Sequence, residues 1–459
     1  MESGLGKHMS IKSMLFSSFP AILMMVAISI YSVVDGFFVS NFAGKTAFAA
    51  VNLIYPFIMV LSSIGFMMGT GGAALVSKRL GEHKLEEANN AFTNCVLFTV
   101  IIGLFFSTVS FFFLPQIALL LGSDEEMLPY CVDYGRILIL GVTSFNLQNL
   151  FQSFFQAAEK GRFGFSVTLG AGVINILLDA LFIVVFKMGI IGAAIGTVTG
   201  QVFGAVIPSI YFLRKNGSPL QLKPSPFSFR DVGRMSSNGM SEFATNISAS
   251  VVSILLNAQL MKFYGQNGVG AYGIICYVWM IFAACFIGIN VSVAPRISYS
   301  LGAGNKEELK SLYGKSLLIL LGFGLFQWAF SFSLTIPISH AFAGYDDTLR
   351  QLTAHANFIY SLVYFFLGFN MFGSAFFTAL NNGVISLLLS IVRLGIMECL
   401  CVLLLPLAAG EDGIWWSVPL AEGMGTIMNL AVMFAFGNKY GYRILKRKRK
   451  EDEKHAEVD

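Results

Sequence analysis

Long apolar segments separated by short polar turns run through most of this chain. In lipid a segment must satisfy its own backbone polar groups, so an apolar stretch of about 20 residues predicts a transmembrane helix. The pattern therefore predicts an all-α membrane protein with twelve transmembrane helices. The expected spans are 14–40, 48–76, 91–113, 128–157, 163–186, 190–213, 236–263, 268–295, 312–336, 352–380, 384–408 and 413–437.

Composition agrees with this pattern. Of the 459 residues, 55% are hydrophobic and 12% are charged, whereas soluble domains contain about 25% charged residues. An ordinary soluble protein is therefore excluded. Lys7 and Lys12 precede the first apolar run as they would in a signal peptide, but the run continues to about residue 40 without a small-residue cleavage site. We expect this segment to be retained as the first span.

Lysine and arginine orient the predicted bundle because they are enriched in cytoplasmic loops. Of the 30 Lys and Arg residues, 24 lie at the termini or in loops on the same side, and four lie on the other side. We therefore expect both termini to be cytoplasmic, in a multi-pass protein of the cell membrane. The basic run 446–450 is then a tail that contacts anionic headgroups. It lacks the interleaved aromatic residues of a nucleic-acid site, so no nucleic-acid partner is expected.

The two halves of the chain are similar. At an offset of 221, residues 75–87 and 296–308 are identical at five of 13 positions, among them Gly81 and Gly302. Because six spans return the chain to its starting side, this is a parallel repeat, which is typical of secondary transporters. We expect two six-helix lobes related by a pseudo-two-fold axis along the membrane normal. The predicted parts are an N-lobe at 1–213, a cytoplasmic linker at 214–231, a C-lobe at 232–438 and a charged tail at 439–459.

Ionisable residues inside spans cost about 2.5–3.5 kcal/mol each by insertion scales, so each is a functional candidate. Asn175 and Asp179 are four residues apart and share a helix face. With Asp35, Thr197 and Gln201 they could form an oxygen-rich site for Na⁺ or for an exchangeable proton. The alternative is that Asn175 and Asp179 only hold helices together. The remaining candidates are polar positions of the fourth span or ionisable residues of other spans: Gln152, Gln156, Arg136, Glu242, Arg393, Glu398 and Glu422.

Two further patterns concern helix shape and packing. Pro20 lacks a backbone donor and would kink the first helix, unless it lies near the membrane surface and merely starts that helix. Glycines at 192, 196, 200 and 204 form a small-residue stripe that predicts close helix packing. For Glu242, Arg393 and Glu398, a buried ion pair or a helix-end position is as reasonable as a role in transport.

Motifs of soluble enzymes are missing from the sequence. It contains no phosphate-binding Gly-Lys-Ser/Thr loop, no His-Glu-x-x-His and no Gly-x-Ser-x-Gly. We therefore expect neither an enzyme nor an ATP-driven pump, and no cofactor beyond a coupling ion, H⁺ or Na⁺. The six cysteines fall inside apolar stretches without a Cys-x-x-Cys pair, which indicates neither a zinc site nor a disulfide framework.

The whole chain resembles the multidrug and toxic compound extrusion (MATE) family. The resemblance rests on the twelve spans in two halves, on the Leu-Gly followed by Glu-Glu after the second span of each half, on Gln156-Ala157-Ala158-Glu159-Lys160-Gly161-Arg162, and on Asn175-x-x-x-Asp179-x-x-Phe182. Within the family the chain is most similar to the DinF-like branch and its MepA-type members. The residues that match this branch's N-lobe cation site are Asp35, Asn175, Asp179 and Thr197, with Gln152 at a nearby polar position.

The resemblance implies a monomer that exports amphipathic, often cationic compounds in exchange for inward H⁺ or Na⁺ by alternating access of its lobes. It also implies that Pro20 is a site of helix bending. A lipid-linked oligosaccharide flippase of similar fold is the alternative. It should line its cavity with several cations, and Arg136 and Arg393 are the only arginines within spans.

Overall fold

The computed structural model describes residues 4–42, 45–344 and 346–443, which are helices and connecting turns without any strand. The helices of the first half are η1 (Gly4–Gly6), α1 (Ile11–Phe42), α2 (Lys45–Gly81), α3 (Leu85–Leu120), α4 (Leu128–Ala157), α5 (Gly161–Asp179), η2 (Ala180–Val185) and α6 (Gly189–Leu213). The second half contains α7 (Phe229–Gly302), α8 (Lys306–Ser333), α9 (Thr335–Ala343), α10 (Asp347–Tyr360), α11 (Val363–Ala379), α12 (Gly383–Ser390), η3 (Ile391–Glu398), α13 (Cys399–Ala409) and α14 (Asp412–Tyr440).

These helices confirm the all-α membrane fold with twelve spans. In the described part of the chain, nine helices are long and apolar enough to cross a membrane, or ten if the bent pair α10 and α11 forms one span. The 74-residue α7 contains two of the predicted spans. The thirty-residue α4 has the length of a span, but its many polar side chains lower its hydropathy. These two helices bring the number of spans to twelve.

The helices depart from simple rods at identifiable places. Gly265 has φ 60° and ψ −147° and divides α7, and a residue without a Cβ adopts this conformation at little cost. The predicted span 352–380 is divided at 361–362, where α10 and α11 meet with a bend of 48°. The segments η2 and η3 are π-helical continuations of α5 and α12. The apolar pattern of the sequence predicts neither the bend nor the π-helical turns.

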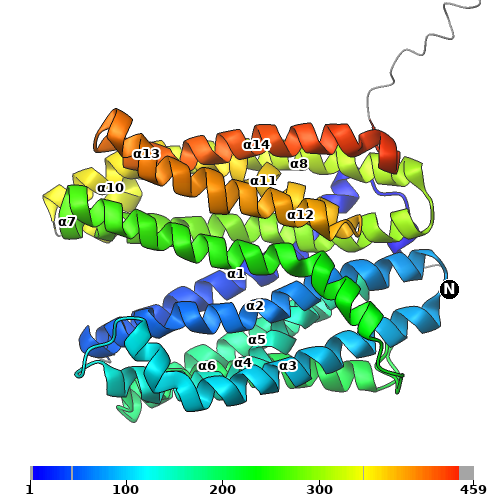
Figure 1. Ribbon diagram of the computed structural model, residues 1–459, viewed down its shortest axis with the longest axis horizontal. Coiled ribbons are helices and arrows are strands. Elements are labelled where there is room, and N and C mark those ends of the chain that lie inside the picture. The colour runs from blue at the N-terminus through cyan, green and yellow to red at the C-terminus, as the bar shows by residue number, and fades with distance from the viewer. Residues whose placement is uncertain (1–3, 43–44, 345, 444–459) are drawn as a thin grey trace, which may run out of the picture.

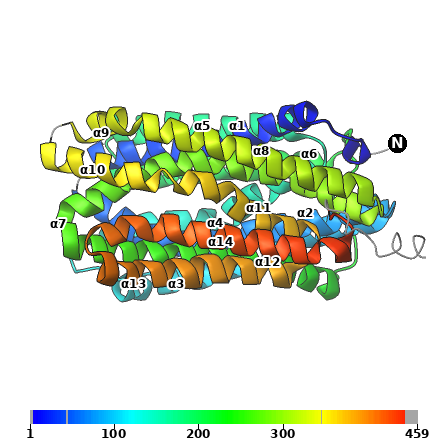
Figure 2. The same cartoon turned by 90° about the horizontal axis from the view of Figure 1, so that it is seen from above.

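The helices form two six-span lobes, with α1–α6 in one layer and most of α7–α14 in the other (Figure 1). Figure 2 shows that the helices of both lobes run along the same long axis. Each lobe has a large apolar core of its own. The first turns of α7 also contribute Val232 and Met235 to the N-lobe core. Between the lobes, Arg79 of α2 forms a paired ionic contact with Asp231 of α7, with N–O distances of 2.8 and 2.7 Å. The lobes are therefore joined most firmly where α2 ends and α7 begins.

Glycines make this joint unusually close. A Cβ atom built on any of four glycines would lie 1.9–2.1 Å from a main-chain carbonyl oxygen of the opposite lobe, so α2 and α7 approach backbone to backbone. We call these four positions the glycine contact. They are Gly71 against Met235, Gly239 against Met67, Gly81 against Tyr299 and Gly302 against Lys78. The contact closes the lobes at the end of the bundle that holds the start of α1 and the end of α14, which we call the termini end.

Residues 4–10 cross the same end and touch both lobes. The Leu5 amide donates to Glu159 Oε1 of the N-lobe at 3.3 Å, and Arg296 of the C-lobe donates to the Gly4 carbonyl at 3.1 Å. His8 Nδ1 lies 2.5 Å from Glu308 Oε2 of α8. The N-terminal segment therefore adds polar contacts to the glycine contact at the termini end.

Candidate functional site

A cavity of about 290 Å³ lies in the half of the bundle away from the termini end. Its wall comes from five helices of the N-lobe and from two residues of α7, so it faces the gap between the lobes. Among the described residues that line it, Asp35 is the one charged residue. The lining residues are Tyr31, Ser32, Asp35, Gly36, Val39, Val51, Asn52, Tyr55, Ile58, Met59, Tyr134, Leu138, Val142, Phe145, Gln148, Ala171, Asn175, Thr197, Gly200, Gln201, Tyr277 and Met280.

The two N-lobe aspartates come together at this wall. Asp35 of α1 lines the cavity, and Asp179 at the end of α5 is fully buried. The two carboxyl groups are close enough to interact electrostatically with each other, so we call them the carboxyl pair. Tyr134 is close enough to act electrostatically on both of them. One carboxyl group thus meets the cavity, and the other lies behind it.

The oxygen atoms around the carboxyl pair are short of donors. Within the described residues, no backbone N–H, side-chain N–H or hydroxyl group donates to either oxygen of Asp179, to Asp35 Oδ1 or to Asn175 Oδ1. Asn175 instead donates through Nδ2 to Thr197 Oγ1 at 3.4 Å. Buried acceptors without donors are costly, and two facing carboxylates repel each other. A proton or a cation between them would relieve both costs.

The glycine stripe of α6 explains how these groups fit. A Cβ at Gly196 would lie 2.3 Å from Asp179 Oδ1, and a Cβ at Gly200 would lie 2.8 Å from the Ala171 carbonyl and 3.3 Å from Asn175 Cβ. Gly196 and Gly200 therefore pack α6 closely against α5, as the spacing of the stripe predicts. They also leave the space that the buried carboxyl and amide groups occupy.

Of the other predicted N-lobe residues, only one lies at the cavity. Gln201 lines the cavity, but Gln152 and Gln156 are not among the lining residues. Gln156 lies next to Gly161 at the far end of α4. From α4 the cavity receives Gln148 instead, whose Oε1 is buried without a donor. Sequence reasoning missed Gln148 because α4 carries polar residues around much of its surface, and only its packing shows which of them face the cavity.

Pro20 lies within α1, nine residues after its first residue Ile11. At 1.5 Å per residue this is about 14 Å from the start of the helix. The interpretation that Pro20 only starts the helix is therefore wrong. Asp35 is a further 15 residues along the same helix, about 22 Å away, so any bend at Pro20 would move the helix that carries one member of the carboxyl pair.

The C-lobe has a buried charged cluster of its own. Arg393 donates through Nη1 to Glu422 Oε1 at 2.8 Å and to Oε2 at 3.1 Å, and Asn370 also donates to this carboxylate. Glu398 and Glu242 are close enough to interact electrostatically with Arg393. We call these residues the C-lobe cluster. Of the two alternatives to a transport role for Arg393, a buried ion pair or a helix-end position, the structure shows the ion pair, with Glu422 as the partner. None of the four ionisable groups of this cluster lines the cavity.

Comparisons with known proteins identify relatives over nearly the whole chain. The family model described as MatE matches residues 20–181 and 243–403, once in each lobe. The multidrug export protein MepA of Staphylococcus haemolyticus is 23% identical over 435 residues, which cover 93% of this chain and 94% of that protein. MepA of Staphylococcus aureus is 23% identical over 431 residues, with 92% and 93% covered.

Solved structures share the fold. A multidrug resistance MATE family transporter of the MOP superfamily in an outward-facing conformation superposes with a TM-score of 0.89 at 19% identity, covering 95% of this chain and 97% of that one. A MATE structure in a straight conformation gives a TM-score of 0.89 at 20% identity, with 95% and 98% covered. At these identities the likeness concerns the fold alone.

Proposed function

Because the chain belongs to the MatE family, we propose that it is a secondary active multidrug exporter, which moves amphipathic, often cationic compounds outward in exchange for inward H⁺ or Na⁺. Relatives that are similar over more than nine-tenths of the chain are named multidrug export proteins. The observation that carries the proposal is the carboxyl pair, in which two facing carboxyl groups lack donors at the wall of a cavity between the lobes.

The two aspartates would divide the work by position. Asp35 reaches the cavity, where its negative charge would attract a cationic drug. Asp179 is enclosed behind it and would hold the coupling ion with oxygens from Asn175 and Thr197. A proton or Na⁺ that neutralises the pair removes the attraction for the drug, so ion and drug compete. A ligand shifts a conformational equilibrium only by its differential affinity for the two states, and this competition supplies such a difference.

The same geometry argues against the flippase alternative. A pyrophosphate-linked cargo requires cationic side chains in the cavity, and the described lining contains neither lysine nor arginine. Arg393 is committed to Glu422 in the C-lobe. The termini end is closed and the cavity lies on the other side of the bundle, which supports the proposal of alternating access. The distribution of Lys and Arg supports the proposal that the termini lie in the cytoplasm.

Transport into lipid vesicles tests the proposal. Dye movement would be followed with a pH gradient alone, with a Na⁺ gradient alone and with neither. One of the gradients should drive dye movement by the wild-type protein, and Asp35→Asn and Asp179→Asn should each abolish that movement at normal expression. The matched control is Asp133→Asn, because Asp133 is an exposed carboxylate of the same lobe. Gradient-driven transport by both site variants at the wild-type rate would refute the proposal.

A further inference from the structure

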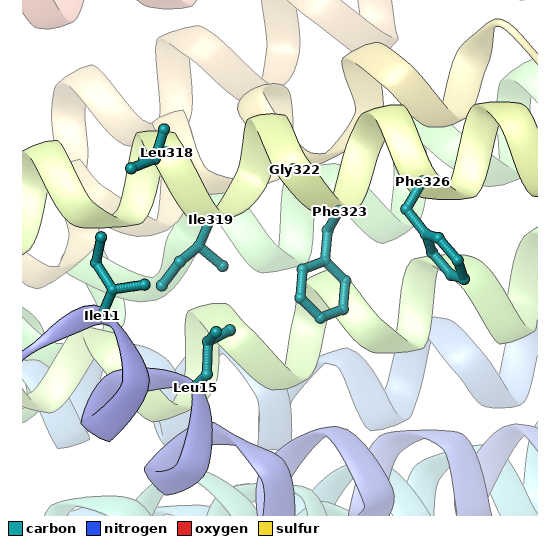
Figure 3. A pocket seen from close by; sticks show the side chains of 7 residues that line it. All are labelled: Ile11, Leu15, Leu318, Ile319, Gly322, Phe323 and Phe326. Atoms are coloured by element: carbon teal, nitrogen blue, oxygen red, sulfur yellow. The ribbon is translucent and has the colours of Figure 1, made fainter.

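An apolar groove lies between the lobes on the outer surface of the bundle, far from the cavity. It has a volume of about 410 Å³. Ile11 and Leu15 of α1 form one side, and residues of α8 spaced three or four apart form the other (Figure 3). The α8 residues are Leu318, Ile319, Gly322, Phe323 and Phe326.

The groove continues along α1. A second hollow of about 580 Å³ shares Ile11 and Leu15 with the first and adds Lys12, Phe16 and Phe19. Phe16 and Phe19 are 69% and 54% exposed. The two hollows together make an open apolar surface that is accessible from the lipid and bridges the first helix of the N-lobe and α8 of the C-lobe.

The length of the groove matches one leaflet. From Leu318 to Phe326 the α8 axis rises about 12 Å, and half of a bilayer's hydrocarbon core is about 15 Å. The groove begins at the level of Ile11, the first residue of α1, and runs toward the membrane centre. These dimensions suit an acyl chain of the leaflet at the termini end.

The mouth of the groove is basic. Lys12 is exposed on its rim, and Lys315 lies one turn before Leu318 and Ile319 on α8. Lys315 donates to the Met9 carbonyl and lies 3.3 Å from His8 Nε2. The nearby Glu308 is bound to His8, and among the described residues no carboxylate pairs with either lysine. Each such lysine attracts anionic headgroups by about 1 kcal/mol, whereas a cationic drug would be repelled.

We propose that this groove binds one anionic phospholipid, whose acyl chain lies between α1 and α8 and whose headgroup phosphate contacts Lys12 and Lys315. The inference rests on the proposed function only for its orientation, which makes the leaflet the cytoplasmic one. Because the lipid touches both lobes, it would favour the arrangement in which the termini end is closed.

Gly322 allows a precise test. A Cβ at Gly322 would meet no atom within 4 Å, and Gly322 lines the groove, so the side chain of Gly322→Phe would start in open space and occupy the groove. Gly273 of α7 is equally open and is not among the residues that line the groove, so Gly273→Phe is the matched control. For the charge, Lys12→Gln is compared with Lys215→Gln, an exposed lysine of the linker between α6 and α7.

The full-length protein would be purified with equal amounts of phosphatidylglycerol and phosphatidylcholine, and retained lipids counted by native mass spectrometry. The wild-type protein and Gly273→Phe should retain one phosphatidylglycerol that Gly322→Phe lacks. Lys12→Gln should weaken the preference for phosphatidylglycerol by about fivefold, which corresponds to ~1 kcal/mol, and Lys215→Gln should not.

Three results would overturn the inference. They are equal lipid retention by Gly322→Phe and the wild-type protein, equal retention of phosphatidylcholine and phosphatidylglycerol, and displacement of phosphatidylglycerol by tetraphenylphosphonium, which would make the groove a drug path. Lipid counting needs no transport, so its failure is distinguishable from failure of the proposed export.

Discussion

Adding one methyl group to the glycine contact should open the termini end. In Gly239→Ala the new Cβ would lie 1.9 Å from the Met67 carbonyl oxygen, about 1.5 Å short of ordinary van der Waals contact. Both partners are helix backbone, so neither can give way by a rotamer change. Such overpacking typically costs about 1–3 kcal/mol, but only in the conformation in which α2 and α7 touch. The population of the open conformation should therefore rise about 5- to 150-fold relative to the closed one.

Hydrogen exchange measured by mass spectrometry would detect this shift. In Gly239→Ala, the amides at the end of α2 and the start of α7 should exchange faster than in the wild-type protein. Gly233→Ala is the control: it lies in the same helix, its Cβ would meet nothing within 4 Å, and it carries the same gain in helix propensity. Faster exchange throughout α11 as well would signal unfolding rather than opening. Identical exchange at the termini end in both variants would refute the reasoning.

Three further expectations concern the interior of the lobes. Arg393→Met should destabilise the protein by about 3–5 kcal/mol because it leaves a buried carboxylate unpaired, and Arg393→Met with Glu422→Met should restore most of the loss in a thermal unfolding assay. Gly196→Ala should displace the buried carboxyl group of Asp179, and it should abolish most gradient-driven transport with only a small fall in unfolding temperature; retained transport with a large fall in unfolding temperature would contradict the packing described above. Gln148→Ala should weaken dye binding by about two- to tenfold, the worth of one hydrogen bond, whereas Gln152→Ala should leave the dissociation constant unchanged; equal effects would show that the cavity wall is misassigned.

Much of the fold could be predicted because a segment that crosses lipid must be apolar over its whole length, which is easily recognised in a sequence. The spans follow from segment length, and the lobes follow from the repeat at an offset of 221. The bend between α10 and α11 could not be predicted, since it divides one continuous apolar segment. The break at Gly265 falls in a predicted turn. Its φ of 60° could not be predicted, because glycine can adopt this conformation but also adopts many others.

The arrangement of the N-lobe site residues could likewise be predicted only in part. Asn175 and Asp179 could be placed on one helix face from their spacing alone. The proximity of Asp35 to Asp179 could not be predicted, because it depends on how α1 and α5 pack against each other. In α4, 18 residues are buried, so the helix has no single inward face. The positions of its polar residues therefore do not predict how the helix is rotated about its axis. This is why Gln148, rather than Gln152, lines the cavity.

Two of the four contacts in the glycine contact, those of Gly81 and Gly302, have the form of an isologous interface, in which the same patch from two copies meets itself across a two-fold axis. Gly81 touches the backbone at Tyr299 and Gly302 touches it at Lys78, and the offset of 221 relates both glycines and both of their partners. In a dimer of identical six-helix chains, one substitution would change both contacts at once. In the joined chain each contact can change alone. Because the two halves of the joined chain can change separately, the N-lobe can hold the carboxyl pair while the C-lobe holds the ion pair of Arg393 and Glu422.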